Sequence, residues 1–315
     1  MREYLVSKLA HTAIVVLCVL TLVFVVLHLT GDPVMMMLPS NASQEEIQAL
    51  TATLGLDQPL HVQYTKWVKG MVTADWGRSY RDGRTVGEVI ADRIPATLVL
   101  MLSAFVVAIV LGLATGIVSA VRQYSLFDHA MTLGAMVALS IPTFWLGLMG
   151  IYVFAELLRV LPPGNIGTIG APFSLADRLR HLALPAATLG LVMVATWSRY
   201  TRASMLEVIG EDYIRTARAK GVAGRVVILK HALKNALLPL VTLAGLQLPL
   251  IFSGALVTET VFTWPGMGRL FVDSIGYRDY PVLMGLLILT SALVVVGNLV
   301  TDLVYAAIDP RIGHA

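Results

Sequence analysis

The sequence predicts an all-α polytopic membrane protein with six transmembrane helices and both termini in the cytoplasm. Of the 315 residues, 57% are hydrophobic and only 14% are charged, with a mean hydropathy of +0.76, whereas about a quarter of the residues in soluble domains are charged. Six stretches lack Asp, Glu, Lys and Arg for long enough to span a bilayer, which takes roughly 20 residues. None alternates apolar and polar residues as a membrane β-strand does, so all six are expected to be helices. The stretches are Leu9–Leu29, Ala96–Val121, His129–Ala155, Leu182–Ser198, Asn235–Thr258 and Pro281–Thr301.

The first stretch is predicted to be an uncleaved membrane anchor. Arg2 and Lys8 precede it, which favours a cytoplasmic N-terminus. The stretch is too long for the hydrophobic region of a signal peptide, and Gly31–Pro33 offers no small-x-small cleavage site. Six spans then return the C-terminus to the cytoplasm.

A long extracytoplasmic loop, Thr30–Pro95, follows the first span, and the sequence predicts two helices in it. Ser43 and Glu46 form a capping box for a helix that starts near Gln44, and Gly55 is suited to end it in a left-handed conformation. These helices either cover the membrane domain or dock a partner. The second helix reads "LHVQYTKWVKGMV" and places Leu60, Tyr64, Trp67, Val68 and Met71 on one face.

The loop between the fourth and fifth spans carries the densest positive charge. The fourth stretch is the shortest and is expected to continue past Arg199. From Arg199 to Lys234 there are eight basic and three acidic residues, a net charge of +5, which indicates a cytoplasmic location.

This loop contains the charged passage "EDYIRTARAKGV", Glu211–Val222. A helix here would begin with acids and end with bases, which complements its dipole. Tyr213, Ala217 and Gly221 would lie on one stripe, and Gly221 would end the helix. A helix with small residues on its docking face would fit a groove on a cytoplasmic partner. A charged loop that only sets the topology is the alternative.

The last extracytoplasmic loop contains a turn signal at Pro265-Gly266. Phe262, Trp264 and Phe271 around it suit a re-entrant or interfacial segment.

Several kinds of chemistry are missing from the sequence. A phosphate-binding P-loop needs a Gly-Lys dipeptide, and the chain has none. Its seven histidines lack ligand spacing, and packing explains Met35–Met37 better than a metal does. The single Cys18 allows no internal disulfide, and the basic residues form no stripe for nucleic acid. We therefore expect no enzyme activity, metal, cofactor or nucleic-acid partner for this chain.

The predicted spans contain no ionisable residue at mid-membrane, which argues against a proton- or sodium-coupled carrier. Gln247 and Asn298 are amide side chains inside the fifth and sixth spans. They either line a pathway or make hydrogen bonds between helices. A transporter of this composition is expected to take its energy from another subunit.

Eight short motifs are spread along nearly the whole chain: "GDP" (Gly31–Pro33), "GLDQPLHVQY" (Gly55–Tyr64), "IPATL" (Ile94–Leu98), "RTARAKG" (Arg215–Gly221), "HALKNALLP" (His231–Pro239), "PGMGRL" (Pro265–Leu270), "RDYPV" (Arg278–Val282) and "DPRI" (Asp309–Ile312). Taken in order, they resemble the first permease subunit of the dipeptide, oligopeptide and nickel ABC-importer family. One departure is that Arg215-Thr216-Ala217 stands where the general importer motif begins with Glu-Ala-Ala, and this departure is typical of the peptide subgroup.

The resemblance implies a multi-pass subunit of the bacterial inner membrane that forms half of a pathway for peptides. A second homologous permease would form the other half. Two cytoplasmic ATPases would hold ATP and Mg, and an extracytoplasmic binding protein would deliver the substrate. Residues 1–93 would be an anchor and outer loop, 94–309 the transmembrane domain, and 310–315 a tail. The coupling loop to the ATPases would comprise Glu211, Asp212, Tyr213, Arg215, Thr216, Ala217, Arg218, Ala219, Lys220 and Gly221.

Three alternatives remain open at the level of sequence. The same architecture could import nickel or another metal chelate, because cargo choice in such systems lies largely with the binding protein. A self-contained channel or secondary carrier, and a membrane scaffold that recruits a partner without transport, are the others.

Overall fold

A computed structural model describes residues 13–22, 24–25, 34, 38, 42–73, 75–253 and 255–308. Several features predicted above lie outside these residues: Arg2, Lys8, Gly31–Pro33, Met35–Met37 and Asp309–Ile312. The regular elements are the helices α3 (Gln44–Leu54), α4 (Leu60–Val72), α5 (Val86–Ala91), α6 (Ile94–Val121), α7 (Leu126–Ser140), α8 (Thr143–Gly150), the π-helix η1 (Ile151–Leu157), α9 (Leu175–Ile209), α10 (Asp212–Ala219), α11 (Gly224–Val226), the π-helix η2 (Val227–Ala232), α12 (Leu233–Ser253), α13 (Leu256–Val261), α14 (Met267–Gly276) and α15 (Tyr280–Ile308).

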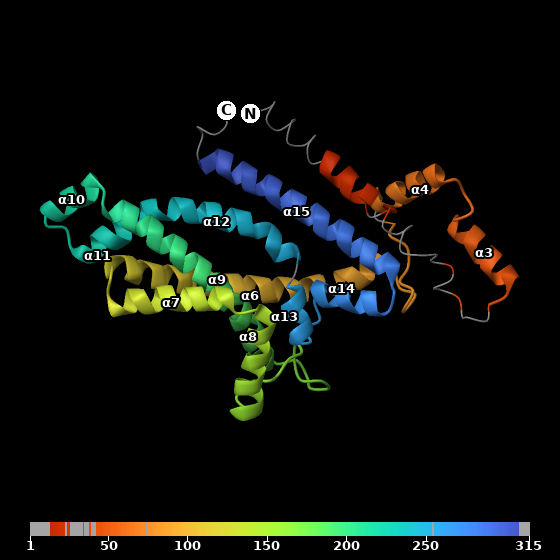
Figure 1. The fold of residues 1–315 in the computed structure, drawn as a ribbon, viewed down its shortest axis with the longest axis horizontal. Coiled ribbons are helices and arrows are strands. Elements are labelled where there is room, and N and C mark those ends of the chain that lie inside the picture. Colours follow the sequence, from red (N-terminus) through yellow and green to blue (C-terminus); the bar gives the residue numbers. More distant parts are fainter. Residues whose placement is uncertain are drawn as a thin grey trace.

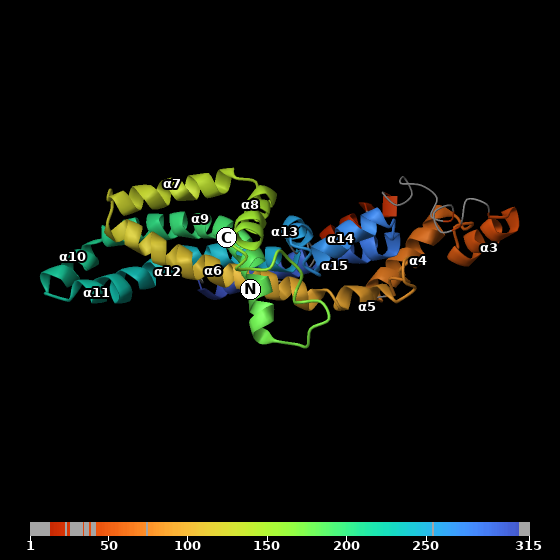
Figure 2. The ribbon, with the colours of Figure 1, turned by 90° about the horizontal axis from the view of Figure 1, so that it is seen from below.

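The long helices form an elongated bundle with different elements at its two ends. Figure 1 shows α6, α7, α9, α12 and α15 running along the molecule, with α10 and α11 at one end. The short helices α5 and α14 lie toward the opposite end, and α3 and α4 extend beyond them; Figure 2 gives the same arrangement from below. The charged passage and the long loop are therefore separated by the length of the bundle.

Four segments of the described chain are long and apolar enough to cross a membrane: Val86–Val121, Leu175–Ile209, Gly224–Gln247 and Tyr280–Thr301. A fifth crossing is present only if α7 (Leu126–Ser140) and the following helix Thr143–Leu157 count as one broken span. The angle between these two helices is 103°. In the described part of the first stretch, only the shorter apolar helix Ala13–Leu22 is present. Six spans and their orientation therefore stay predictions.

The third apolar stretch was predicted as one span, and the structure breaks it. Ile141 is extended, with φ −82° and ψ 128°, because a residue that precedes a proline is disfavoured in the helical region. Pro142 then starts α8. The absence of charge alone does not reveal this bend, whereas Pro142 does.

The other expected helices are present, with two changes of boundary. Ser43 and Glu46 cap α3 reciprocally, and Gly55 ends it with φ +67°; α4 spans the predicted sequence. The fourth span continues past Arg199 as expected, to Ile209, and also starts earlier, at Leu175. The fifth stretch ends sooner than its lack of charge suggests, because α12 stops at Ser253 and α13 is a separate short helix.

Helices α6 and α9 approach each other closely through two glycines of α6. A Cβ on Gly112 would lie 2.4 Å from Trp197 Cβ, and one on Gly116 would lie 2.5 Å from Thr201 Cβ. Thr115 Oγ1 donates a hydrogen bond to Ser198 Oγ at 2.9 Å beside them. This contact fixes the course of α9, which carries α10 at its end.

Candidate functional site

The helix α10 is a short, sharply ended element at one end of the bundle. It begins after Glu211, which is extended (φ −70°, ψ 148°). At its other end Gly221 N donates to Arg218 O at 3.0 Å and Val222 N donates to Ala217 O at 3.2 Å. With Gly221 at φ +75°, this is the Schellman motif that a glycine after a helix favours. The prediction that Gly221 ends the helix is confirmed.

One isoleucine fastens α10 to the bundle. Ile214 is completely buried and belongs to an apolar cluster with Met205 of α9, Ala120 of α6, and Val227 and Ala236 of η2 and α12. Burying an isoleucine side chain stabilises by about 1.5–3 kcal/mol. The helix is therefore held by the ends of three long helical segments.

Ala217, one of the three residues of the predicted stripe, packs against the bundle. Ala217 is half-buried and packs on the same cluster as Ile214, and the Tyr213 hydroxyl accepts a hydrogen bond from Asn235 Nδ2 at 2.7 Å. Small size at Ala217 lets α10 lie close to its own protein. The burial of Ile214 brings Ala217 against the bundle, whereas the other two stripe residues, Tyr213 and Gly221, remain exposed.

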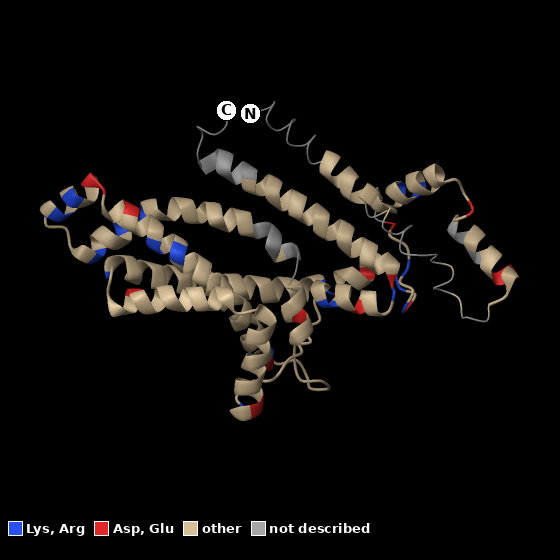
Figure 3. Ribbon diagram, in the orientation of Figure 1, with Lys and Arg blue, Asp and Glu red and all other residues tan. Residues whose placement is uncertain are grey.

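The outward face of α10 is polar and charged. The side chains of Asp212 and Arg215 are 94% and 77% exposed and lie 3.3 Å apart. Thr216, Arg218, Ala219 and Lys220 are exposed as well, and Figure 3 shows the basic residues of α10 and α11 gathered at this end. An exposed ion pair of this kind contributes little to stability, so these side chains are free to meet another surface.

A buried ion pair close to this end was not expected from the sequence. Arg202 of α9 donates to both carboxylate oxygens of Asp128 at the start of α7, at 2.6 and 2.8 Å. Asp128 is 1% exposed and also accepts from Tyr124 N at 3.0 Å. The sequence signal for this pair was that Asp128 directly precedes the third charge-free stretch and that Arg202 lies just beyond the end of the fourth.

The structure does not bring the two amide side chains of the spans into contact. Gln247 is half-buried, and its Oε1 accepts a hydrogen bond from Trp197 Nε1 of α9 at 2.9 Å. Asn298 lies exposed on α15. The bond of Gln247 matches the alternative in which these amides join helices. A role of either residue in a pathway stays a prediction.

At the opposite end of the bundle, a buried carboxylate joins three elements. Glu259 of α13 is completely buried, accepts from Thr97 Oγ1 of α6 at 2.8 Å and from Arg269 N of α14 at 3.1 Å. Thr97 Oγ1 in turn accepts from Met267 N at 2.8 Å. A Cβ on Gly266 would lie 2.4 Å from this carboxylate. The glycine in the predicted turn is thus needed to admit the Glu259 side chain.

The aromatic residues of this turn are buried in protein. Phe262 and Trp264 are 0% and 1% exposed, and Trp264 Nε1 donates to Ala96 O at 2.8 Å. The expected turn at Pro265-Gly266 is confirmed, since Gly266 caps α14. The short helices α13 and α14 pack against the bundle on either side of it.

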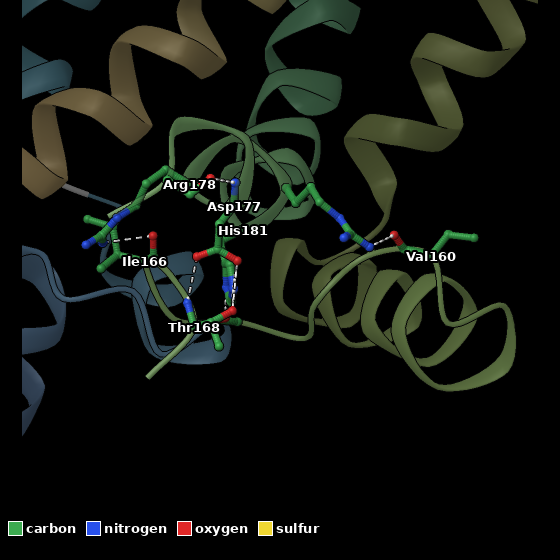
Figure 4. A network of polar contacts seen from close by, with 9 residues as sticks. Val160, Ile166, Thr168, Asp177, Arg178 and His181 are labelled. Carbon is green, nitrogen blue, oxygen red and sulfur yellow. Dashed lines mark hydrogen bonds and ion pairs between the residues drawn. The ribbon is translucent and has the colours of Figure 1, made fainter. Parts of the chain in front are cut away.

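The loop between η1 and α9 is tied to the start of α9 by side chains of one helical turn, as Figure 4 shows. Thr168 donates to both oxygens of Asp177 at 2.8 Å. Arg178 Nη1 donates to Ile166 O at 3.0 Å, and His181 Nδ1 donates to Gly164 O at 2.6 Å. The loop also meets the α13–α14 turn, where Asn165 N donates to Phe262 O at 2.8 Å.

The segment before α5 is fastened to the turn before α15. Ser79 Oγ and Tyr80 N both donate to the carboxylate of Asp279, the latter at 3.1 Å. Partial burial raises the pKa of the Tyr80 hydroxyl, and the Asp279 carboxylate raises it further. Tyr80 is therefore neutral at physiological pH.

No group of three or more His, Cys, Asp or Glu side chains is placed to hold a metal ion within the residues that the structure describes. The buried acids at the two ends, Asp128 and Glu259, are hydrogen-bonded by protein donors.

The described chain is a helical bundle with several segments long and apolar enough to cross a membrane, which is typical of a multi-pass membrane protein. Residues 108–314 match the family described as the binding-protein-dependent transport system inner membrane component, and residues 1–101 match the N-terminal component of such membrane proteins. The chain belongs to this family and is a multi-pass protein of the bacterial inner membrane.

Full-length relatives carry names of peptide permeases. The chain is 42% identical over 316 residues to the oligopeptide transport system permease protein AppB of Bacillus subtilis, covering 100% of both chains. It is 45% identical to a putative peptide permease protein of Brucella suis, over 99% of each chain. It is 41% identical to the glutathione transport system permease protein GsiC of Escherichia coli K12, over 100% of each.

Proposed function

We propose that this chain is a permease subunit of an ABC importer and forms half of a translocation pathway for peptides. A second homologous permease supplies the other half. Relatives named for oligopeptide, peptide and glutathione transport align with it from end to end, which supports peptides as the cargo. The chain itself carries no covalent chemistry.

The energy is supplied by two ATPase subunits that hold ATP and Mg and contact α10 on the cytoplasmic side. The observation that carries this assignment is the two-sided character of α10. Ile214 is completely buried in the bundle while Asp212 and Arg215 are highly exposed. A push on the outer face is therefore delivered to α6, α9 and η2, which pack around Ile214.

Transport follows from differential binding to two orientations of the pathway. ATP binding changes how the ATPases contact α10, and the orientation that fits the closed ATPases becomes favoured. The opposite end of the bundle, with α3, α4 and α14, receives the extracytoplasmic binding protein.

The coupling role is tested by charge reversal on the outer face of α10. In proteoliposomes that contain both permeases, the ATPases and the binding protein, Arg215→Glu is expected to abolish ATP-driven uptake of a labelled tripeptide. Arg215 contributes little to the fold because it is 77% exposed. Arg122→Glu is the matched control, since Arg122 is an exposed arginine in the α6–α7 turn at the same end of the bundle. Equal uptake in both variants contradicts the assignment.

The cargo and the energy source are tested with the unmodified complex. If the complex takes up the tripeptide and a nickel chelate does not compete with that uptake, the cargo is a peptide. If the complex takes up the nickel chelate instead, the cargo is a metal chelate. Flux through the purified chain alone, without ATP, would instead show a self-contained carrier. A complex that binds ATPases and never moves substrate would show a scaffold.

A further inference from the structure

A cavity of about 650 Å³ lies at the end of the bundle opposite α10. It opens between the segment before α5, the start of α6, and α14 with the turn that follows it. Its size falls within the range of roughly 300–1,000 Å³ that is typical of small-molecule sites. Its apolar lining includes Ala96, Ile166, Pro265 and Leu270.

Three arginines line the cavity, and they differ in what they bind. Arg84 Nη2 is engaged by Asp92 Oδ2 at 2.7 Å. The guanidinium of Arg81 lies over the ring of Tyr277, 4.0 Å from its centre, and no carboxylate of the described chain pairs with it. Arg93 likewise has no ion pair or side-chain hydrogen bond among the described residues, although its side chain is half-buried.

This arrangement leaves the hydrogen-bond donors of two guanidinium groups available, those of the exposed Arg81 and of the half-buried Arg93. Stacking on Tyr277 positions Arg81 without using its hydrogen-bond donors. Arginine binds a carboxylate through two parallel hydrogen bonds, and a half-buried guanidinium without an anion is poorly compensated. The cavity is therefore complementary to a compact ligand with a carboxylate.

The other charged groups of the cavity define the rest of the ligand. Asp279 is occupied by Ser79 and Tyr80, and Asp92 by Arg84. Asp82 accepts only a backbone hydrogen bond, from Arg84 N at 3.1 Å, so its carboxylate can still accept from an ammonium group. Within the described chain, Asp82, Arg81 and Arg93 therefore have no ion-pair partner, although the carboxylate of Asp82 also acts electrostatically on Arg84.

We propose that this cavity is a receiving site for a short peptide, with Arg81 and Arg93 binding its C-terminal carboxylate and Asp82 facing its amino group. The inference rests on the proposed function and assigns the first contact between the permease and its cargo. An acidic side chain of the binding protein is the competing occupant. A lone carboxylate would use the two arginines and leave the apolar lining and Asp82 without a partner, so the cavity fits a peptide better.

The direct test measures ligand binding to the purified transporter complex without its binding protein. Saturation-transfer NMR is recorded with tri-alanine and with its C-terminal amide, on the complex in nanodiscs. Tri-alanine is expected to bind and the amide to bind about tenfold more weakly, as the loss of one charge-assisted interaction implies. Arg81→Gln/Arg93→Gln is expected to abolish this preference.

Arg278→Gln is the matched control. Arg278 is an exposed arginine that follows Tyr277 in the chain and does not line the cavity. Its replacement removes one positive charge, half of what the double variant removes, and should leave tri-alanine binding unchanged. Arg93→Lys keeps the charge and should retain part of the preference. Size-exclusion profiles of each complex show that the variants assemble.

Each outcome decides the inference. Equal binding of acid and amide, unchanged binding in the double variant, or equal loss in Arg278→Gln overturns it. A double variant that binds tri-alanine normally and loses affinity for the binding protein assigns the cavity to that protein instead. Uptake by the unmodified complex is measured in parallel: its absence refutes the proposed function, whereas normal uptake with no acid preference refutes only this site.

Discussion

Replacing Ile214 by alanine should detach α10 from the bundle while leaving its outer face intact. Ile214 is completely buried among Met205, Val227 and Ala236, and removing a buried isoleucine side chain costs about 2–5 kcal/mol. Because α10 has eight residues and little stability of its own, most of this cost falls on its attachment. A loss of about 3 kcal/mol lowers the ratio of attached to detached helix by about 100-fold.

Two measurements follow this perturbation. Hydrogen exchange should accelerate at the amides of α10 and spare α6, because local opening is governed by the free energy of that element alone. Uptake should fall while ATP hydrolysis continues, since the ATPases would move a helix that no longer carries the spans. Ile214→Val is the control, with a cost of about 0.5–1.5 kcal/mol. Unchanged exchange together with wild-type uptake in Ile214→Ala would refute the reasoning.

Three further changes probe other parts of the structure. Gly221→Ala should weaken uptake, because the left-handed conformation costs about 1–2 kcal/mol although a Cβ there meets nothing within 4 Å; Gly221→Asn should be milder, and equal uptake in both would contradict a backbone effect. Asp128→Asn should lower the free energy of unfolding in detergent by about 3 kcal/mol, because the guanidinium of Arg202 loses its carboxylate. The double variant Asp128→Asn/Arg202→Gln should recover part of this loss. Additive losses of the two substitutions would argue against coupling. Gly266→Ala should destabilise the fold by about 1–3 kcal/mol through overpacking against the Glu259 carboxylate. In a Glu259→Ala background, where that carboxylate is absent, the same substitution should destabilise the fold measurably less.

Local features of the fold could be predicted because they depend on residues close in sequence. Ser43 and Glu46 satisfy each other's amides three residues apart, and Gly221 adopts its conformation within the turn it ends. The course of α9 past Arg199 follows from the same kind of continuous pattern.

Contacts between distant elements could not be predicted in this way. The pair of Asp128 and Arg202 joins residues 74 positions apart, and Glu259 meets Thr97 across 162 positions. Nothing in the local pattern indicates either partner. The inward rotation of Ala217 was missed for a similar reason, since only the tertiary position of Ile214 determines which side of α10 is covered.

The carboxylate of Glu259 has a consequence for how the bundle can move. It is bound at once by α6 and α14 from its place on α13, and the indole of Trp264 adds a second bond to α6. These three elements must therefore shift as one block whenever that end of the bundle rearranges. Any compliance at that end has to lie outside the contacts that join α6, α13 and α14.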